Sequence, residues 1–143
     1  MDPRNTAAYA AYLNRGLAQE ALGQSAAALA SYDRAIALKA DLADAHFNRG
    51  NVLHAMKQFE ASIASYGAAI NLGSRNNGVR GTRSHVRMEI CDWRELAAER
   101  VDVALRIRNG EPASDPFVLL TLSDDGQLQR RAAENWVRAE CAV

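Results

Sequence analysis

The sequence predicts an all-α protein built from repeated helical hairpins. The main observation is that identical residues recur at a spacing of 34 positions, in the pairs Asn14 and Asn48, Arg15 and Arg49, Gly16 and Gly50, Tyr32 and Tyr66, Ala35 and Ala69, Ile36 and Ile70, and Leu38 and Leu72. Apolar residues follow helical spacing, except over residues 117–122, where a strand pattern is conceivable. The composition is 48% hydrophobic but only 6% aromatic, which suits closely packed helices. A period of about 34 residues is typical of stacked helix-turn-helix units.

The first two hairpins are predicted over residues 9–42 and 43–76. The first helix of each contains a small residue, Gly16 or Gly50, that permits close approach of its partner helix. Each second helix carries an aromatic residue followed by a small-apolar pair, namely Tyr32 with Ala35-Ile36 and Tyr66 with Ala69-Ile70. This pattern resembles the tetratricopeptide repeat (TPR), although Ala40 and Ser74 stand where the family usually has proline. The resemblance implies a right-handed α-α superhelix that acts as a protein-interaction scaffold and not as an enzyme.

A third, degenerate hairpin is predicted over residues 77–110. Continuing the period from Ala45, Val52, Met56 and Phe59 gives four apolar residues, Val79, Val86, Ile90 and Trp93. Its helices are expected near residues 78–91 and 94–107, with a stop at Asn109-Gly110. Ser84 replaces the repeated glycine and Thr82 the repeated asparagine, so the packing of the repeat is expected to persist while its surface changes.

Two flanking segments complete the expected architecture of about three hairpins plus a C-terminal capping helix. Residues 1–8 are expected to be a connector, because Asp2-Pro3 resembles the link that closes a preceding repeat. Residues 111–143 are expected to hold a turn-rich connector and the capping helix. Ser123-Asp124-Asp125 offers a cap for that helix, predicted over residues 126–141. Its apolar face would contain Leu128, Ala132, Trp136 and Val137.

The order of motifs in the tail suggests an alternative parentage. Cys91-Asp92-Trp93, then Asp115-Pro116-Phe117, then a polar helix resemble the junction between repeats and catalytic domains in the SPINDLY and O-linked N-acetylglucosamine transferase family. A histidine that the family has near this last helix has no counterpart at residues 123–125. The resemblance implies that the chain could be the non-catalytic TPR portion of such a glycosyltransferase, presenting protein acceptors to catalytic domains absent from this chain.

The TPR resemblance also implies the binding residues. In the family, one asparagine of each first helix grips extended peptide backbone, and this position corresponds to Asn14 and Asn48; shared ancestry of the repeats is the alternative explanation. The other implied lining residues are Leu13, Leu17, Phe47, Asn51 and His54. Leu13 and Phe47 occupy a position where family members that clamp a terminal carboxylate use basic residues, so that mode is disfavoured. The residues assigned to repeat packing are Gly16, Gly50, Tyr32, Tyr66, Ala35, Ala69 and Trp93.

The sequence contains no recognisable motif for catalysis, for cofactor binding or for metal binding. His46 and His54 lack the adjacent-turn spacing of a metal pair, no serine has a partnered histidine, and no phosphate-binding loop follows a strand. Charges balance at 17 of each sign, which argues against nucleic acid as a partner. No apolar run approaches the roughly 18 residues of a membrane span. Cys91 and Cys141 are expected to be buried free thiols, which fits a cytoplasmic location.

Two surface features leave alternatives open. Arg80, Arg83 and Arg87 form a basic stripe that could be a solvated face, a contact with an absent domain, or an anion site. The first helix has no capping element before it, so its apolar side near Tyr9, Tyr12 and Leu13 is expected to be exposed. This open repeat end predicts possible self-association into a homo-oligomer, beside binding of a protein or peptide partner.

Overall fold

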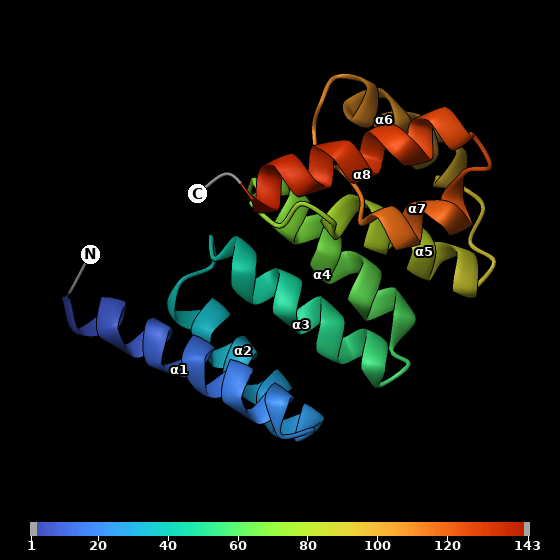
Figure 1. The fold of residues 1–143 in the computed structure, drawn as a ribbon. Helices are drawn as coiled ribbons and strands as arrows, with labels where there is room; N and C mark the ends of the chain where they lie inside the picture. The colour runs from blue at the N-terminus through green and yellow to red at the C-terminus, as the bar shows by residue number, and fades with distance from the viewer. Residues whose placement is uncertain (1–2, 142–143) are drawn as a thin grey trace. The chain divides into compact units, whose positions relative to one another are not determined.

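A computed structural model of the chain describes residues 3–141. In that part of the chain it contains eight α-helices and no β-strand, which confirms the all-α prediction (Figure 1). The helices divide into two compact units, residues 1–75 (unit 1) and 76–143 (unit 2). None of the described helices combines the length and the apolar composition needed to cross a lipid bilayer.

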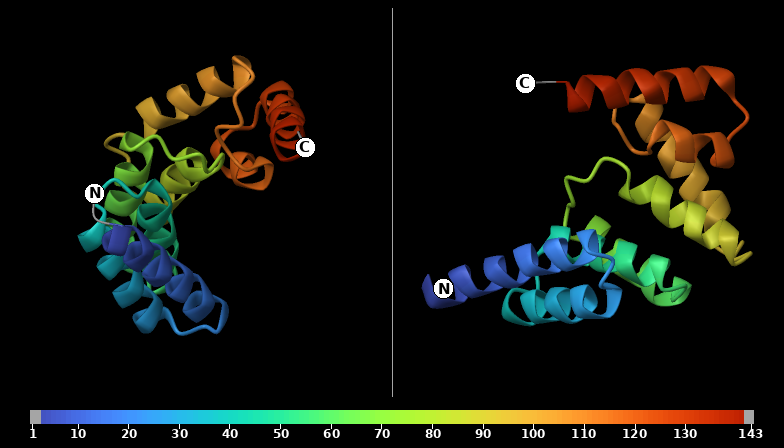
Figure 2. Two further views of the ribbon diagram at one scale, coloured as in Figure 1. Left: turned by 90° about the vertical axis from the view of Figure 1, so that its left-hand side faces the viewer. Right: turned by 60° about the horizontal axis from the view of Figure 1, so that its bottom comes forward.

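Unit 1 consists of two helical hairpins. Its helices are α1 (Pro3–Ala21), α2 (Ser25–Leu38), α3 (Ala43–Ala55) and α4 (Phe59–Asn71). Helix α1 packs against α2 and α3 packs against α4, while α2 also contacts α3 and joins the two hairpins (Figures 1 and 2). The first helix starts earlier than expected: residues 3–8 are helical where a connector was predicted, and residues 1–2 of that connector lie outside the described part. Proline is favourable in the first turn of a helix, because the N–H groups there have no hydrogen-bond partner within the helix and the missing N–H of proline costs nothing.

A glycine and a tyrosine fix the distance between the two helices of each hairpin in unit 1. The Tyr32 ring lies against Gly16, and the Tyr66 ring lies against Gly50 so closely that a Cβ atom built on Gly50 would stand 2.6 Å from the ring. Both rings are buried, with exposed fractions of 0% and 1%. Only a residue without a side chain fits at these two helix positions, so the recurrence of this pair explains why the hairpins share one geometry.

The phenol groups of the two tyrosines reach polar partners on the first helix of the same hairpin. Tyr32 donates to the Glu20 carboxylate over 2.7 Å, and Tyr66 donates to the side-chain oxygen of Asn51 over 2.8 Å. Burial raises the pKa of Tyr32 above its ordinary value, and the hydrogen bond to Glu20 raises this pKa further. A buried hydroxyl group with a satisfied hydrogen bond costs the fold little.

Unit 2 contains the third hairpin and two further helices. The hairpin is formed by α5 (Val79–Glu89) and α6 (Leu96–Arg108), followed by α7 (Pro116–Leu122) and α8 (Gly126–Glu140). Helix α7 contacts α5, and α8 contacts both α6 and α7 (Figure 2). Together they enclose one apolar core, whose buried members are Val103, Ile107, Ala113, Leu119, Leu122, Leu128 and Ala132.

Helices α7 and α8 both begin at an aspartate cap. The Asp115 carboxylate accepts hydrogen bonds from the backbone N–H groups of Phe117 and Val118, and the Asp125 carboxylate accepts from those of Gln127 and Leu128. The cap of α8 matches the predicted start at residue 126. Helix α7 was not predicted, although an aspartate followed by proline is a helix-start signal; the short apolar run after it fits a strand equally well.

Trp93 and the two cysteines depart from the predicted burial. Trp93 is 60% exposed, so its assignment to repeat packing is wrong. Phe59, its counterpart 34 residues earlier, begins α4, whereas α6 begins only at Leu96 and leaves Trp93 in the turn. Cys91 and Cys141 are free, as expected, but exposed. Cys91 follows the end of α5 with a left-handed φ of 55°, which places it in the turn and not on the packed face.

Candidate functional site

The exposed faces of α1 and α3 bring the repeated asparagines into one part of unit 1. Asn14 is exposed on α1 and Asn48 is half-buried on α3. Leu17, with an exposed fraction of 45%, lies three residues after Asn14 and hence on the same face of α1. Asn51 holds the same relation to Asn48. Helices α1 and α3 contact each other within this unit, so the two asparagines lie on neighbouring helices.

The side-chain amides of Asn14 and Asn48 have no hydrogen-bond partner among the residues that the structure describes. Asn51 differs, because its side-chain oxygen accepts the Tyr66 hydroxyl over 2.8 Å and is thereby tied to the core. An asparagine amide can donate to a peptide carbonyl and accept from a peptide N–H. The two partnerless amides are therefore suited to hold the backbone of another chain.

Three other predicted lining residues take part in packing. Leu13 packs against the cluster of Ala28, Tyr32 and Val52, so it belongs to the core between the hairpins rather than to a groove surface. The Phe47 ring lies 5.9 Å from the Tyr66 ring, and the His54 ring lies 5.8 Å from the Phe59 ring. Both Phe47 and His54 remain half-buried. Of the predicted set, Asn14 and Leu17 are exposed, while Asn48 and Asn51 are half-buried and make no ring contact with another described residue.

The N-terminal end of unit 1 is covered more fully than expected. The Lys39 ammonium lies 5.0 Å from the centre of the Tyr9 ring, and the Arg15 guanidinium lies 4.9 Å from the centre of the Tyr12 ring. Such cation–π contacts shield one face of each ring. Both tyrosines are half-buried, so the predicted exposed apolar end is already partly closed by residues of the same unit.

The basic stripe of Arg80, Arg83 and Arg87 is an internal element of the third hairpin. Arg80 pairs with Asp102 at 3.4 Å, while Arg83 and Arg87 each pair with Glu99 at 3.0 Å. Arg87 also pairs with Asp92 and Glu95. The sequence analysis offered a solvated face, a contact with an absent domain or an anion site, and none of these describes ion pairs within the hairpin. The acidic partners lie on α6 and in the turn before it, so they are missed when only the residues near the stripe are considered.

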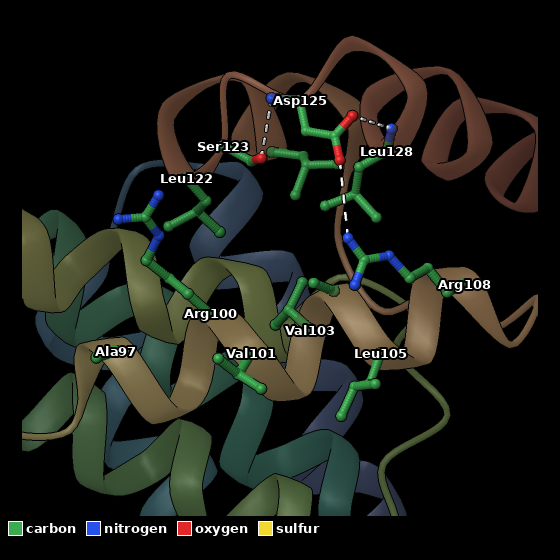
Figure 3. A pocket seen from close by; sticks show the side chains of 12 residues that line it. Ala97, Arg100, Val101, Val103, Leu105, Arg108, Leu122, Ser123, Asp125 and Leu128 are labelled. Atoms are coloured by element: carbon green, nitrogen blue, oxygen red, sulfur yellow. Dashed lines mark hydrogen bonds and ion pairs between the residues drawn. The ribbon is translucent and has the colours of Figure 1, made fainter.

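A second concave surface lies in unit 2, and the sequence analysis missed it. This groove, with a volume of about 430 Å³, is bounded by α6 on one side and by the α7–α8 segment on the other (Figure 3). Ala97, Val101 and Leu105 supply its α6 side at a spacing of four residues. That spacing marks a second apolar face on α6, beside the buried face of Leu96, Val103 and Ile107, and it could have been found in the sequence.

Within residues 3–141, no group of three or more His, Cys, Asp or Glu side chains could hold a metal ion.

Comparison with protein-family models identifies repeats in the first half of the chain. Residues 21–57 match the TPR repeat, and residues 43–73 match the tetratricopeptide repeat. Neither match extends beyond residue 73, so the suggested junction with glycosyltransferase domains gains no support. No curated protein matches the chain. The chain thus contains tetratricopeptide repeats, which generally mediate contacts between proteins and are typically non-catalytic.

Proposed function

We propose that unit 1 is a protein-interaction module that binds an extended peptide segment across the exposed faces of α1 and α3. The observation that carries this proposal is the pair Asn14 and Asn48, which recur at one repeat position on two neighbouring helices and lack partners within the described part of the chain. Peptide backbone offers donors and acceptors at regular intervals, so two amides in register can hold it without demanding a particular sequence.

Leu17 and Asn51 supply the rest of the surface. Leu17 gives an exposed apolar contact for a side chain of the peptide, and Asn51 is held in place by Tyr66. A preorganised side chain loses less conformational freedom when it binds a ligand, which favours affinity. The predicted class of partner is therefore a protein segment without secondary structure of its own, with an apolar side chain near Leu17.

Site-specific photo-crosslinking tests where the partner binds. A photoreactive residue placed at Leu17 is expected to capture a partner from a cell extract. The same residue placed at Ala30, which is exposed on α2, is expected to capture none. Capture from both positions, or self-capture alone, would contradict the peptide surface; self-capture would indicate that a second copy of this chain occupies it.

Affinity measurements with a peptide from the captured protein test the asparagines. Replacing Asn14 or Asn48 with alanine is expected to weaken binding by about 1 kcal/mol each, since one donor and one acceptor are lost. Stability should change by no more than about 0.5 kcal/mol, because both side chains lack internal partners. Asn71→Ala, at an exposed asparagine that ends α4, is the matched control and should leave affinity unchanged. Equal affinity of all three variants would refute the assignment.

A further inference from the structure

The groove between α6 and the α7–α8 segment has an apolar floor and a basic rim. Val103, Leu119, Leu122 and Leu128 from the core of unit 2 form the floor. Val101 and Leu105 on α6 remain 60% and 52% exposed beside it. Apolar side chains that gather on one surface are a common mark of a binding site.

Arginine dominates the charge around this groove. Arg100 and Arg108 extend from α6 toward the α7–α8 segment (Figure 3). Arg100 has no acidic partner among the described residues. Arg108 forms an ion pair with Asp125 at 3.8 Å, through the carboxylate oxygen that does not cap α8. The groove therefore carries an excess of positive charge, two arginines against one aspartate, and Arg100 is the one that no described acidic residue neutralises.

We propose that this groove docks an amphipathic helix of another protein that carries aliphatic side chains on one face and carboxylates beside them. The aliphatic side chains would fill the space between α6 and Leu122, while the carboxylates would pair with Arg100 and Arg108. The α6 face from Ala97 to Arg108 is about 17 Å long at the rise of an α-helix, so it matches a partner helix of about three turns. Helix-in-groove binding of this kind uses apolar anchors at helical spacing.

The charge of the rim argues against a second copy of this chain as the occupant. In a twofold contact each partner presents the same surface, so one interface would bring together Arg100 and Arg108 of both copies. Like charges brought together at an interface are unfavourable. An acidic partner turns the same arginines into favourable contacts. This surface belongs to unit 2 and is independent of the asparagine surface of unit 1.

Fluorescence anisotropy with designed helical probes tests the proposal on the full chain. The acidic probe is a labelled peptide of about 15 residues, or four turns, with leucines on one face and glutamates beside them. A second probe replaces the glutamates with lysines, and a third replaces the leucines with serines. The acidic probe is expected to bind saturably and more weakly as salt is added, and the other two to bind at least about tenfold more weakly.

Two valines of similar exposure provide a matched pair of variants. Val101→Glu places a carboxylate in the groove and is expected to weaken acidic-probe binding about tenfold. Val137→Glu makes the same change on α8 outside the groove, at an exposed fraction of 58% against 60%, and should leave affinity unchanged. Arg100→Glu is expected to weaken binding of the acidic probe and strengthen binding of the lysine probe. Arg138, which is exposed on α8 outside the groove, is the control, and Arg138→Glu should do neither. Circular dichroism of each variant verifies that the fold is retained.

Several results would overturn the proposal. They are equal binding of the acidic and lysine probes, no saturable binding of the acidic probe, and equal affinity of the two valine variants. Sedimentation provides a further test. If the chain forms a dimer that Val101→Glu dissociates, a second copy occupies the groove and the proposal is wrong. Asn14→Ala serves to separate the two surfaces, because it should leave acidic-probe binding unchanged.

Discussion

Arg83 and Glu99 join the two helices of the third hairpin through an ion pair whose nitrogen and oxygen lie 3.0 Å apart. At the equivalent positions of the first two hairpins, Arg15 donates to Ser31 over 2.9 Å and Arg49 donates to Ser65 over 2.6 Å. The arginine of the first helix is thus retained in all three hairpins, while its partner on the second helix changes from a hydroxyl group to a carboxylate.

This change coincides with the loss of the glycine–tyrosine contact. The positions equivalent to Gly50 and Tyr66 hold Ser84 and Arg100 in the third hairpin. Ser84 donates to the Glu99 carboxylate over 2.8 Å. The third hairpin therefore replaces the packing of an aromatic ring on glycine by a set of hydrogen bonds and ion pairs around one carboxylate that is 8% exposed.

Replacing Glu99 with glutamine is expected to destabilise unit 2 by about 3 kcal/mol, because Arg83 would lose its carboxylate partner in a largely desolvated site and Arg87 would lose one of its three. Urea unfolding monitored by tryptophan fluorescence measures this, since the chain has 2 tryptophans, Trp93 and Trp136, and both lie in unit 2.

The matched control for Glu99 is Glu134, which pairs with Arg130 over 3.0 Å at an exposed site of α8. Solvent screens such a pair, so Glu134→Gln is expected to cost no more than about 0.5 kcal/mol. Similar effects of the two substitutions would show that the Glu99 network does not stabilise the hairpin.

Gly50→Ala is expected to destabilise unit 1 by about 1 to 3 kcal/mol, because the new methyl group would overlap the buried Tyr66 ring and force the two helices apart. Tyrosine absorbance during unfolding reports on this unit, since all 4 tyrosines lie in it. Gly126→Ala in unit 2, followed by tryptophan fluorescence, is the control, because a methyl group there meets no atom within 4 Å. Shortening the neighbour with Tyr66→Leu should reduce the cost of Gly50→Ala. If Gly50→Ala costs as much stability in the Tyr66→Leu background as in the parent, the strain does not arise from the Tyr66 ring.

The sequence predicts the hairpins of unit 1 well because their repeated residues are the ones that make contact. Gly16 with Tyr32 and Gly50 with Tyr66 are both recurrent and adjacent in space, so one observation yields helix pairing and register. In the third hairpin the glycine and the tyrosine are lost, and the apolar spacing persists together with Arg83. It predicts α5 and α6 but not the later start of α6, which is why Trp93 was misplaced.

The surfaces are less predictable than the helices. The recurrence that pairs Arg15 with Arg49 continues to Arg83, and following it would have located the Glu99 ion pair. Leu13 could not be assigned from spacing alone, because a half-buried leucine on α1 can face either the core or a groove. The groove in unit 2 requires α7 and α8 to be placed against α6, and no local pattern encodes that contact.

A left-handed residue closes each hairpin turn, and only the first of these residues is glycine. Gly23, Lys57 and Cys91 have φ values of 71°, 59° and 55° at equivalent repeat positions. Lys57→Gly and Cys91→Gly are each expected to stabilise the chain by about 0.5 to 1 kcal/mol, since glycine adopts this conformation without the steric penalty of a side chain. Thermal unfolding measures the gain.

The control for the turn substitutions is Asn109→Gly. Asn109 is also exposed and follows a helix, but its φ is −81°, so glycine there only adds freedom to the unfolded chain and should destabilise. A loss of stability from Lys57→Gly and Cys91→Gly as well would show that their side chains contribute more than the backbone strain costs.

The raised pKa of Tyr32 predicts a pH dependence of stability in unit 1. In the unfolded chain tyrosine ionises near pH 10, whereas in the fold burial and the Glu20 carboxylate keep the Tyr32 hydroxyl protonated to higher pH. This contribution to stability is complete below about pH 10 and declines above it by about 1.4 kcal/mol per pH unit, because only the unfolded state releases the proton. Tyr32→Phe should remove that slope, and Glu20→Gln should reduce it. The measurement is urea unfolding of the parent and both variants from pH 8 to 11, and identical slopes in parent and Tyr32→Phe would contradict the protonated, buried state of this hydroxyl group.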